Sequence, residues 1–197
     1  MTHLRRALIV GCSAQVWIDV KAAQNLTTFD AVYCVKQAGI YWTATFQVWV
    51  SLHPEWMDKY ETERRSLGHP GGYEIVSLLS SEAGEHGNKG NIDRRVSYRW
   101  PKMNSSASSG IYAAKVALED GFDKIVLAGI PMDTKAGHFL PETKDVHGQV
   151  RGQYWLGRDT FIDGLEKSIP HLRGKVRSMS GYTAKVLGIP DAEWLKA

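Results

Sequence analysis

The chain has only two cysteines, Cys12 and Cys34, among its 197 residues. Both stand at the ends of apolar runs, and two such cysteines do not make the disulfide framework of a small secreted domain. No apolar run reaches the roughly 20 residues that a membrane-spanning helix needs, and no signal-peptide core follows Met1. We therefore expect reduced thiols in a cytoplasmic protein without a membrane span.

A strong charge of one sign is also lacking. Lysine and arginine number 24 against 21 acidic residues, which gives a net charge of +3 and a weak overall field. One basic segment, 86–102, is interleaved with Tyr98 and Trp100, a pattern that can bind phosphates. A solvated face explains the same segment and is the favoured interpretation, so nucleic acid is the less favoured partner. A homo-oligomer is compatible with this composition.

Two familiar nucleotide motifs are missing. Neither G-x-G-x-x-G nor a Walker loop occurs, which disfavours dinucleotide dehydrogenases and P-loop enzymes. The turn Gly11-Cys12-Ser13 carries a single glycine, which still allows a phosphate to approach the backbone. Cys12 is a candidate nucleophile, but a packed or lining thiol is the commoner role. The acidic and histidine residues of the chain show no recognised ligand spacing, so we expect no bound metal.

The apolar runs that are present predict the fold. Hydrophobic residues make up 43% of the chain and charged residues 23%, enough for one folded domain over 1–197. Runs 7–10 and 125–128 lack polar alternation, as in parallel strands covered on both faces. Strands alternate with helices, which predicts a Rossmann-like α/β fold with a mainly parallel, doubly wound sheet and both runs in its interior. Further strands are expected at 31–35, 45–52, 73–79, 95–100 and 175–179. Helices are expected at 15–23, 54–68, 110–121 and 182–187. Thr160 and Asp163 form a possible capping box at the start of one more helix.

The carboxyl ends of parallel strands meet at one rim, where ligands bind in this fold class. Segments 11–13, 34–36 and 129–133 fall at that rim. The serine-rich loop at 105–109 reaches it too and leads into a helix whose N-terminus presents backbone N–H groups to an anion. Ordinary N-capping is the alternative explanation of Ser108 and Ser109.

A long irregular stretch, at about 130–157, is the predicted lid, because a loop of this length in a compact domain is either functional or disordered. Titratable groups are concentrated in it and just beyond it: Asp133, His138, Glu142, Asp145, His147, Arg151 and Arg158. His138 and His147 are candidate general bases, since histidine titrates near neutral pH. An idle, exposed histidine is the alternative for each.

In its order of segments the chain resembles the small bacterial sialyltransferases. The similar segments are 7–13, 29–34, 108–114, 121–130 and 175–181. The wider group includes motility-associated glycosyltransferases and an archaeal hydroxymethylpterin pyrophosphokinase. The chain also resembles small bacteriophage proteins, which implies no activity and would place it in the host cytoplasm. It departs from the sialyltransferase pattern after Gly11, where Cys-Ser-Ala-Gln replaces Asn-Gly-Pro-Ser, at Val35, which replaces Asn, and at Pro131, which replaces Asp.

The resemblance implies a nucleotide or nucleotide-sugar ligand on the rim, with the donor as substrate, no cofactor and no requirement for a divalent metal. Gly11 and Ser13 correspond to the family's first turn. Its ligand-contacting element corresponds to Ser108, Ser109 and Gly110. We expect the ligand to lie across both elements, beside Cys12 and Lys36.

A transferase of this kind stabilises a departing phosphate and removes a proton from the acceptor hydroxyl. His147 is the expected base and His138 the second choice. The groups expected at the anion are Ser109, the backbone of Gly110, Arg151 or Arg158, and Tyr154. Two alternatives stay open: a non-catalytic interaction or virion protein that keeps the fold, and a pyrophosphokinase that uses ATP, a divalent metal and Asp133.

Overall fold

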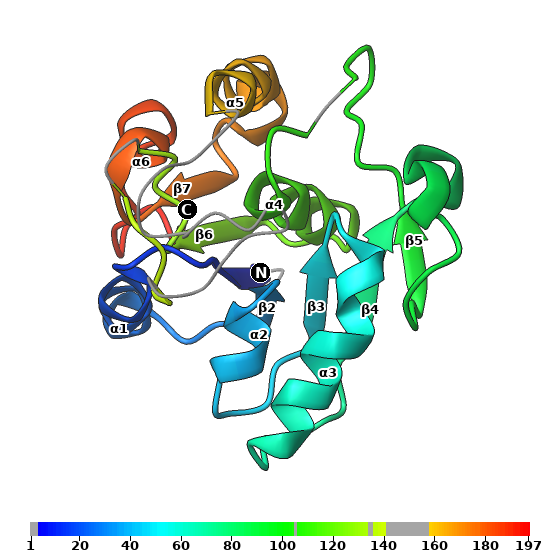
Figure 1. The fold of residues 1–197 in the computed structure, drawn as a ribbon. Coiled ribbons are helices and arrows are strands. Elements are labelled where there is room, and N and C mark those ends of the chain that lie inside the picture. The colour runs from blue at the N-terminus through cyan, green and yellow to red at the C-terminus, as the bar shows by residue number, and fades with distance from the viewer. Residues whose placement is uncertain (1–3, 105, 134–135, 141–157) are drawn as a thin grey trace.

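Seven parallel strands form one sheet in the order β5-β4-β3-β2-β1-β6-β7 (Figure 1). The computed structural model describes residues 4–104, 106–133, 136–140 and 158–197. Each strand pairs in parallel with its neighbours, which confirms the expected sheet, and β1 and β6 pair with each other in its interior. The strands are β1 (Arg6–Val10), β2 (Ala31–Val35), β3 (Val48–Ser51), β4 (Glu74–Leu78), β5 (Arg94–Val96), β6 (Lys124–Ala128) and β7 (Val176–Ser178).

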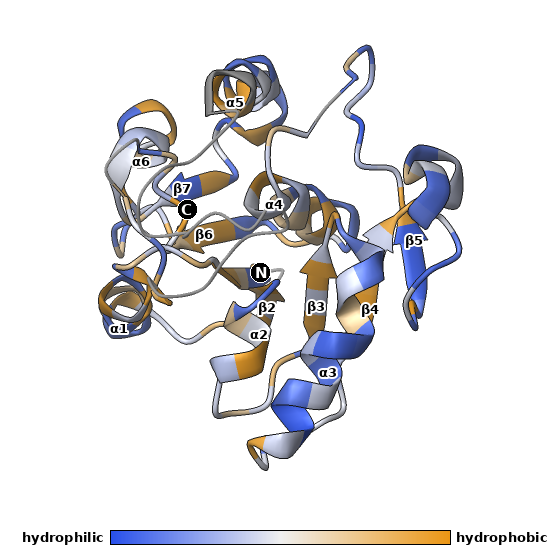
Figure 2. Cartoon of the chain, in the orientation of Figure 1, coloured by the Kyte–Doolittle hydropathy of each residue, from blue (hydrophilic) through white to orange (hydrophobic). Residues whose placement is uncertain are grey.

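Helices cover both faces of the sheet because side chains alternate along each buried strand. Leu8 and Val10 pack with α1 (Val16–Leu26), α2 (Ala38–Tyr41) and α3 (Met57–Ser66). Ala7 and Ile9 point the other way, toward α4 (Ser109–Glu119) and α5 (Arg158–Leu172). Apolar residues accordingly concentrate on the strands in Figure 2. The remaining elements are α6 (Gly181–Leu187) and the short 3-10 turns η1 (Pro54–Trp56), η2 (Ser80–Glu82) and η3 (Gly84–His86).

The chain reverses its direction across the sheet between β1 and β6. It adds β2 to β5 on one side of β1 and then returns through α4 to place β6 on the other side. Small buried residues, including Ala113, Ala114 and Ala117, let α4 lie close against β1, β2, β3 and β6. The carboxyl ends of β1 and β6 therefore form the switch point at which doubly wound sheets bind ligands.

Two local predictions were wrong, and one element was missed. The sequence did not indicate α2, which is a single turn. The helix expected to begin with a capping box at Thr160 and Asp163 begins at Arg158, so Thr160 lies inside its first turn. The edge strand ends at Val96 because the next two residues turn to Glu82, whose carboxylate accepts hydrogen bonds from the Ser97 hydroxyl and the Tyr98 N–H.

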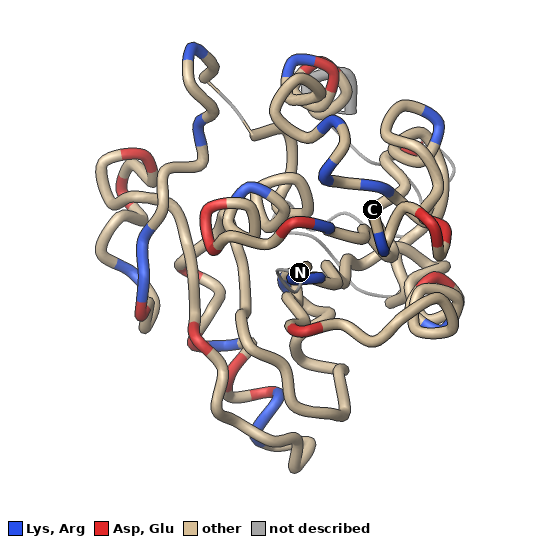
Figure 3. The backbone as a smooth tube through the Cα atoms, turned by 180° about the vertical axis from the view of Figure 1, so that it is seen from behind, with Lys and Arg blue, Asp and Glu red and all other residues tan. Residues whose placement is uncertain are grey.

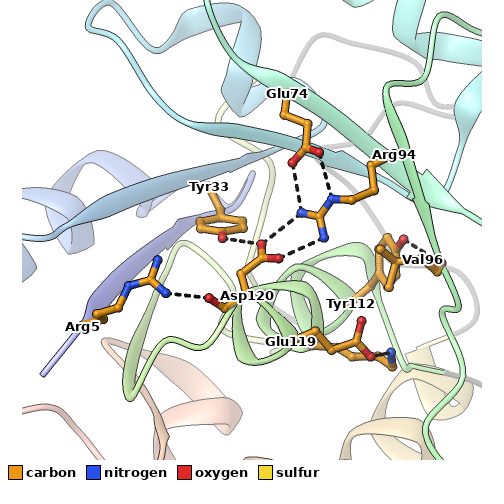
Figure 4. A network of polar contacts seen from close by, with 9 residues as sticks. Arg5, Tyr33, Glu74, Arg94, Val96, Tyr112, Glu119 and Asp120 are labelled. Atoms are coloured by element: carbon orange, nitrogen blue, oxygen red, sulfur yellow. Dashed lines mark hydrogen bonds and ion pairs between the residues drawn. The ribbon is translucent and has the colours of Figure 1, made fainter.

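A polar network lies toward the amino ends of the strands, away from the rim (Figure 4). Arg94 donates to Glu74 at 2.9 and 3.0 Å and to Asp120 at 2.9 and 3.0 Å. The Tyr33 hydroxyl donates to Asp120 at 2.6 Å, and Arg5 donates to the Asp120 carbonyl at 2.7 Å. One guanidinium forms hydrogen bonds with both carboxylates, so the network holds the end of α4 against β2, β4 and β5.

We expect the free energy of unfolding to fall as the pH rises above about 10, the ordinary pKa of tyrosine. Burial, followed by the Asp120 hydrogen bond, raises the pKa of Tyr33, and burial likewise raises the pKa of Tyr112. The folded state thus holds these protons more tightly, so their contribution is complete below pH 10 and is lost as the pH rises through the folded pKa. Urea unfolding at pH 8, 10 and 11 measures the slope. Tyr33→Phe should flatten it, and an unchanged slope in that variant contradicts the assignment.

Candidate functional site

The structure brings the predicted rim segments together at the switch point. The Gly11 N–H donates to the Ala128 carbonyl at 2.8 Å, and the Ser13 N–H donates to the Gly129 carbonyl at 3.1 Å. The turn after β1 is thereby joined to the end of β6. The start of α4 meets them because Gly110 lies against Ile130.

Two glycines that were predicted to contact a ligand, Gly11 and Gly110, instead allow close packing within the protein. A Cβ on Gly11 would lie 2.4 Å from Ile130 Cγ1 and 2.4 Å from the Gly129 carbonyl oxygen. A Cβ on Gly110 would lie 2.8 Å from Ile130 Cδ1. Ile130 therefore fills the space between the β1 turn and α4, and both glycines are needed for that packing whatever else binds at the rim.

Residues 136–140, which we call the strap, lie across the start of α1. The Gly137 carbonyl accepts from the Ala14 N–H at 2.8 Å, and the Phe139 N–H donates to the Cys12 carbonyl at 3.1 Å. Ser13 and His138 are partners in an antiparallel bridge. These contacts join segments more than 120 residues apart, and no local motif in the sequence predicts them.

The strap holds His138 in a defined state. The buried ring accepts the Leu140 N–H at Nδ1, at 2.9 Å, so the neutral ring carries its proton on Nε2. Neither nitrogen then has a lone pair for an acceptor hydroxyl, and His138 can act as a base only after Leu140 moves. His147, Arg151 and Tyr154 lie outside the described residues. Of Arg158, the structure describes only its place at the start of α5.

The turn after β2 contributes Lys36 and Gln37. Lys36 adopts a left-handed backbone with φ of 48°, and its carbonyl accepts the Trp49 indole N–H at 2.7 Å. Beside this turn the Cys12 thiol donates to the Val35 carbonyl at 3.2 Å. A carbonyl acceptor favours the protonated thiol over the thiolate, so the contact supports Cys12 as a lining residue more than as a nucleophile.

The start of α4 has an ordinary N-cap, which was the alternative explanation of the serine-rich loop. Ser108 has extended backbone, and its hydroxyl accepts the Ile111 N–H at 3.3 Å. Ser109 is the first helical residue and is buried. Before the cap, the Ser108 N–H donates to the Ser106 carbonyl across Ala107, whose φ of 75° forces a tight three-residue turn.

Unpartnered buried side-chain oxygens and unusual backbone gather at this rim. Within the described chain, every buried side-chain oxygen that lacks a hydrogen-bond partner lies here: those of Ser13, Gln37 and Ser106. Of the four described non-glycine residues with positive φ, only Lys102 lies elsewhere; the others are Lys36, Ala107 and Met132. Buried unpaired groups and strained backbone are characteristic of functional sites. Both are tertiary properties, so only the position of the strand ends could be predicted from the sequence.

The basic segment contacts the protein itself. Arg94 is matched by two carboxylates, and Arg99 lies 3.6 Å from Glu82. The Trp100 ring stacks on His171 at 4.7 Å. In Figure 3 positive and negative residues are interspersed over the backbone. These contacts engage Arg94, Arg99 and Trp100 with other residues of the protein.

The described residues do not group into a metal site. Asp133 is exposed, and in the part of the chain that is described no three His, Cys, Asp or Glu side chains are grouped to hold a metal ion. None of the described helices is long and apolar enough to cross a membrane. No protein-family model, curated protein or solved structure matches this chain, so a functional assignment depends on the geometry of the rim.

Proposed function

We propose that the carboxyl rim binds a nucleotide, with its phosphate at the start of α4 and the remainder across the ends of β1 and β2. The observation that carries the proposal is the gathering of unpartnered buried oxygens at this rim, on Ser13, Gln37 and Ser106. Leaving such groups unpaired costs about 1–3 kcal/mol each. A nucleotide carries donors and acceptors along its whole length, so it suits a row of such groups that follows two adjacent strands and one helix start.

Two helix starts lie at this rim, and the structure favours that of α4 for the phosphate. The first N–H groups of a helix have no intrahelical acceptor, and the helix dipole favours an anion there. At α1 the strap already supplies an acceptor to Ala14, the residue before the N-cap. At α4 the cap hydroxyl of Ser108 serves only Ile111. The N–H groups of Ser109 and Gly110 are the donors that we assign to the phosphate.

The reaction that we propose for this site is transfer of a sugar from the nucleotide to a hydroxyl acceptor. The bond between the sugar and the phosphate oxygen breaks, and the nucleotide leaves with the electron pair. A bond forms between the sugar carbon and the acceptor oxygen, whose proton passes to a base. His147 is the first candidate base and His138 the second, with Arg151, Tyr154 and Arg158 as further donors to the leaving phosphate.

Thermal denaturation with nucleoside monophosphates and their sugar-linked forms tests the binding. A ligand at 100 times its dissociation constant should stabilise the fold by about 2.7 kcal/mol. Ser109→Asp should abolish the shift, because a carboxylate suits the first turn of a helix but repels a phosphate. Gln15→Asp is the matched control: it places a carboxylate at the start of α1, where the strap lies, and should leave the shift intact.

Two results would contradict the proposal. If no nucleotide shifts the melting temperature of the wild-type protein, a non-catalytic interaction protein with this fold becomes the better explanation. If Ser109→Asp keeps the full shift, the nucleotide binds elsewhere. The described residues give no observation in favour of the pyrophosphokinase alternative, since no carboxylate cluster accompanies Asp133.

A further inference from the structure

Backbone hydrogen bonds and ring contacts hold the strap against the β1 turn and α1. Two backbone hydrogen bonds, from Ala14 to Gly137 and from Phe139 to Cys12, attach it to the β1 turn. The Phe139 ring meets the rings of Trp17 and Tyr41 edge-on, each with centroids 5.6 Å apart, and stacks on the His138 ring at 4.9 Å. Removal of this ring should therefore detach the strap without altering the sheet.

Beneath the strap lies a polar group that the described chain leaves unsatisfied. Ser13 is 2% exposed, and its hydroxyl has no partner in the described residues. It stands next to Ala14, whose N–H is bound to the strap, at the positive end of an 11-residue helix. A buried hydroxyl without a partner is rare in folded proteins, so the Ser13 hydroxyl is available to bind a ligand oxygen.

We propose that the strap is an autoinhibitory device that closes a second anion position at the start of α1. In the closed state the Gly137 carbonyl occupies the Ala14 N–H. When the strap is displaced, an oxygen of an anionic ligand takes the place of that carbonyl and also gives the Ser13 hydroxyl a partner. Only the identification of the anion as a phosphate group rests on the proposed function.

Hydrogen exchange of the full chain without ligand tests the opening. In Phe139→Ala the Ala14 amide should exchange at least 10-fold faster than in the wild type, while the Ile9 amide in β1 reports any global loss of stability and should not change. Phe139→Tyr keeps the ring and should restore slow exchange. Unchanged exchange at Ala14 in Phe139→Ala would overturn the proposal.

Calorimetric titration with inorganic pyrophosphate tests the inhibition. Phe139→Ala should bind this probe about 10-fold more tightly than the wild type, and adding Ser13→Ala should remove the gain. Faster exchange at Ala14 without any gain in pyrophosphate affinity would make the strap purely structural and would also overturn the proposal. If both arms succeed while no nucleotide binds, the strap is confirmed and the proposed nucleotide is wrong.

Discussion

Replacement of Arg64 by methionine is expected to lower the free energy of unfolding by about 3–4 kcal/mol, because it leaves the buried carbonyls of Gly39 and Trp42 without a donor at about 1–3 kcal/mol each. The Arg64 side chain lies on α3 and is only 1% exposed. Its guanidinium lies over the ring of Phe46 at 4.7 Å. It donates hydrogen bonds of 2.6 to 3.2 Å to the carbonyls of Gly39, Trp42, Ala44 and Pro70.

The next residue along the helix provides the control. The Arg65 side chain is 69% exposed, and its contact with Glu61 is 3.9 Å long. Exposed pairs of this kind contribute little, so Arg65→Met should change the stability by less than about 0.5 kcal/mol. Urea unfolding of both variants at pH 7 compares them. Equal midpoints for Arg64→Met and Arg65→Met would show that the hydrogen bonds from Arg64 to the carbonyls do not stabilise the fold.

The second large effect is expected for Gly129→Ala, at roughly 3 kcal/mol or more. Gly129 follows β6 with φ of 69°, and a Cβ there would lie 2.5 Å from Val16 Cβ and 2.9 Å from Val16 Cα. The left-handed backbone costs an alanine about 1 kcal/mol, and overpacking against a helix adds about 1–3 kcal/mol. The Gly129 N–H also donates to Asp19 on α1 at 2.9 Å, which holds the helix in place.

Gly68→Ala separates these two costs. Gly68 has nearly the same φ, 72°, but nothing lies within 4 Å of the position of its missing Cβ. It should lose only the backbone contribution of about 1 kcal/mol. The difference in urea midpoint between the two variants measures the close approach of β6 and α1 at the switch point. Equal losses would contradict that approach.

Adjacent residues show what the sequence can and cannot predict. Arg64 and Arg65 carry the same local signal, two cations at the end of a helix. Yet the Arg64 side chain is buried and the Arg65 side chain lies in solvent, because each step along a helix turns the side chain by about 100°. Which direction is inward depends on Gly39, Trp42 and Ala44, which lie 20 to 25 residues earlier in the chain.

The same distinction applies to the fold and to the rim. The interior position of β1 and β6 followed from their unbroken apolar runs, which only two covered faces explain. A cap at Ser108 or Ser109 was one of the two explanations that their place before a helix allowed, and the structure has the cap at Ser108. The strap and the unpaired Ser13 hydroxyl arise between segments that are remote in sequence. Neither hydrophobic periodicity nor secondary-structure propensity within the strap or the β1 turn predicts that the two are in contact.

The order of the strands along the chain also determines how long one edge of β1 stays unpaired during synthesis. Its partner β2 follows within a few tens of residues, but Arg6 pairs with Lys124, about 120 residues later. At 5–20 residues per second, one edge of this apolar strand stays unpaired for about 6 to 24 s on the ribosome. An unpaired strand edge is a template for wrong pairing. The nascent chain is therefore most in need of chaperone protection in the interval between β2 and β6.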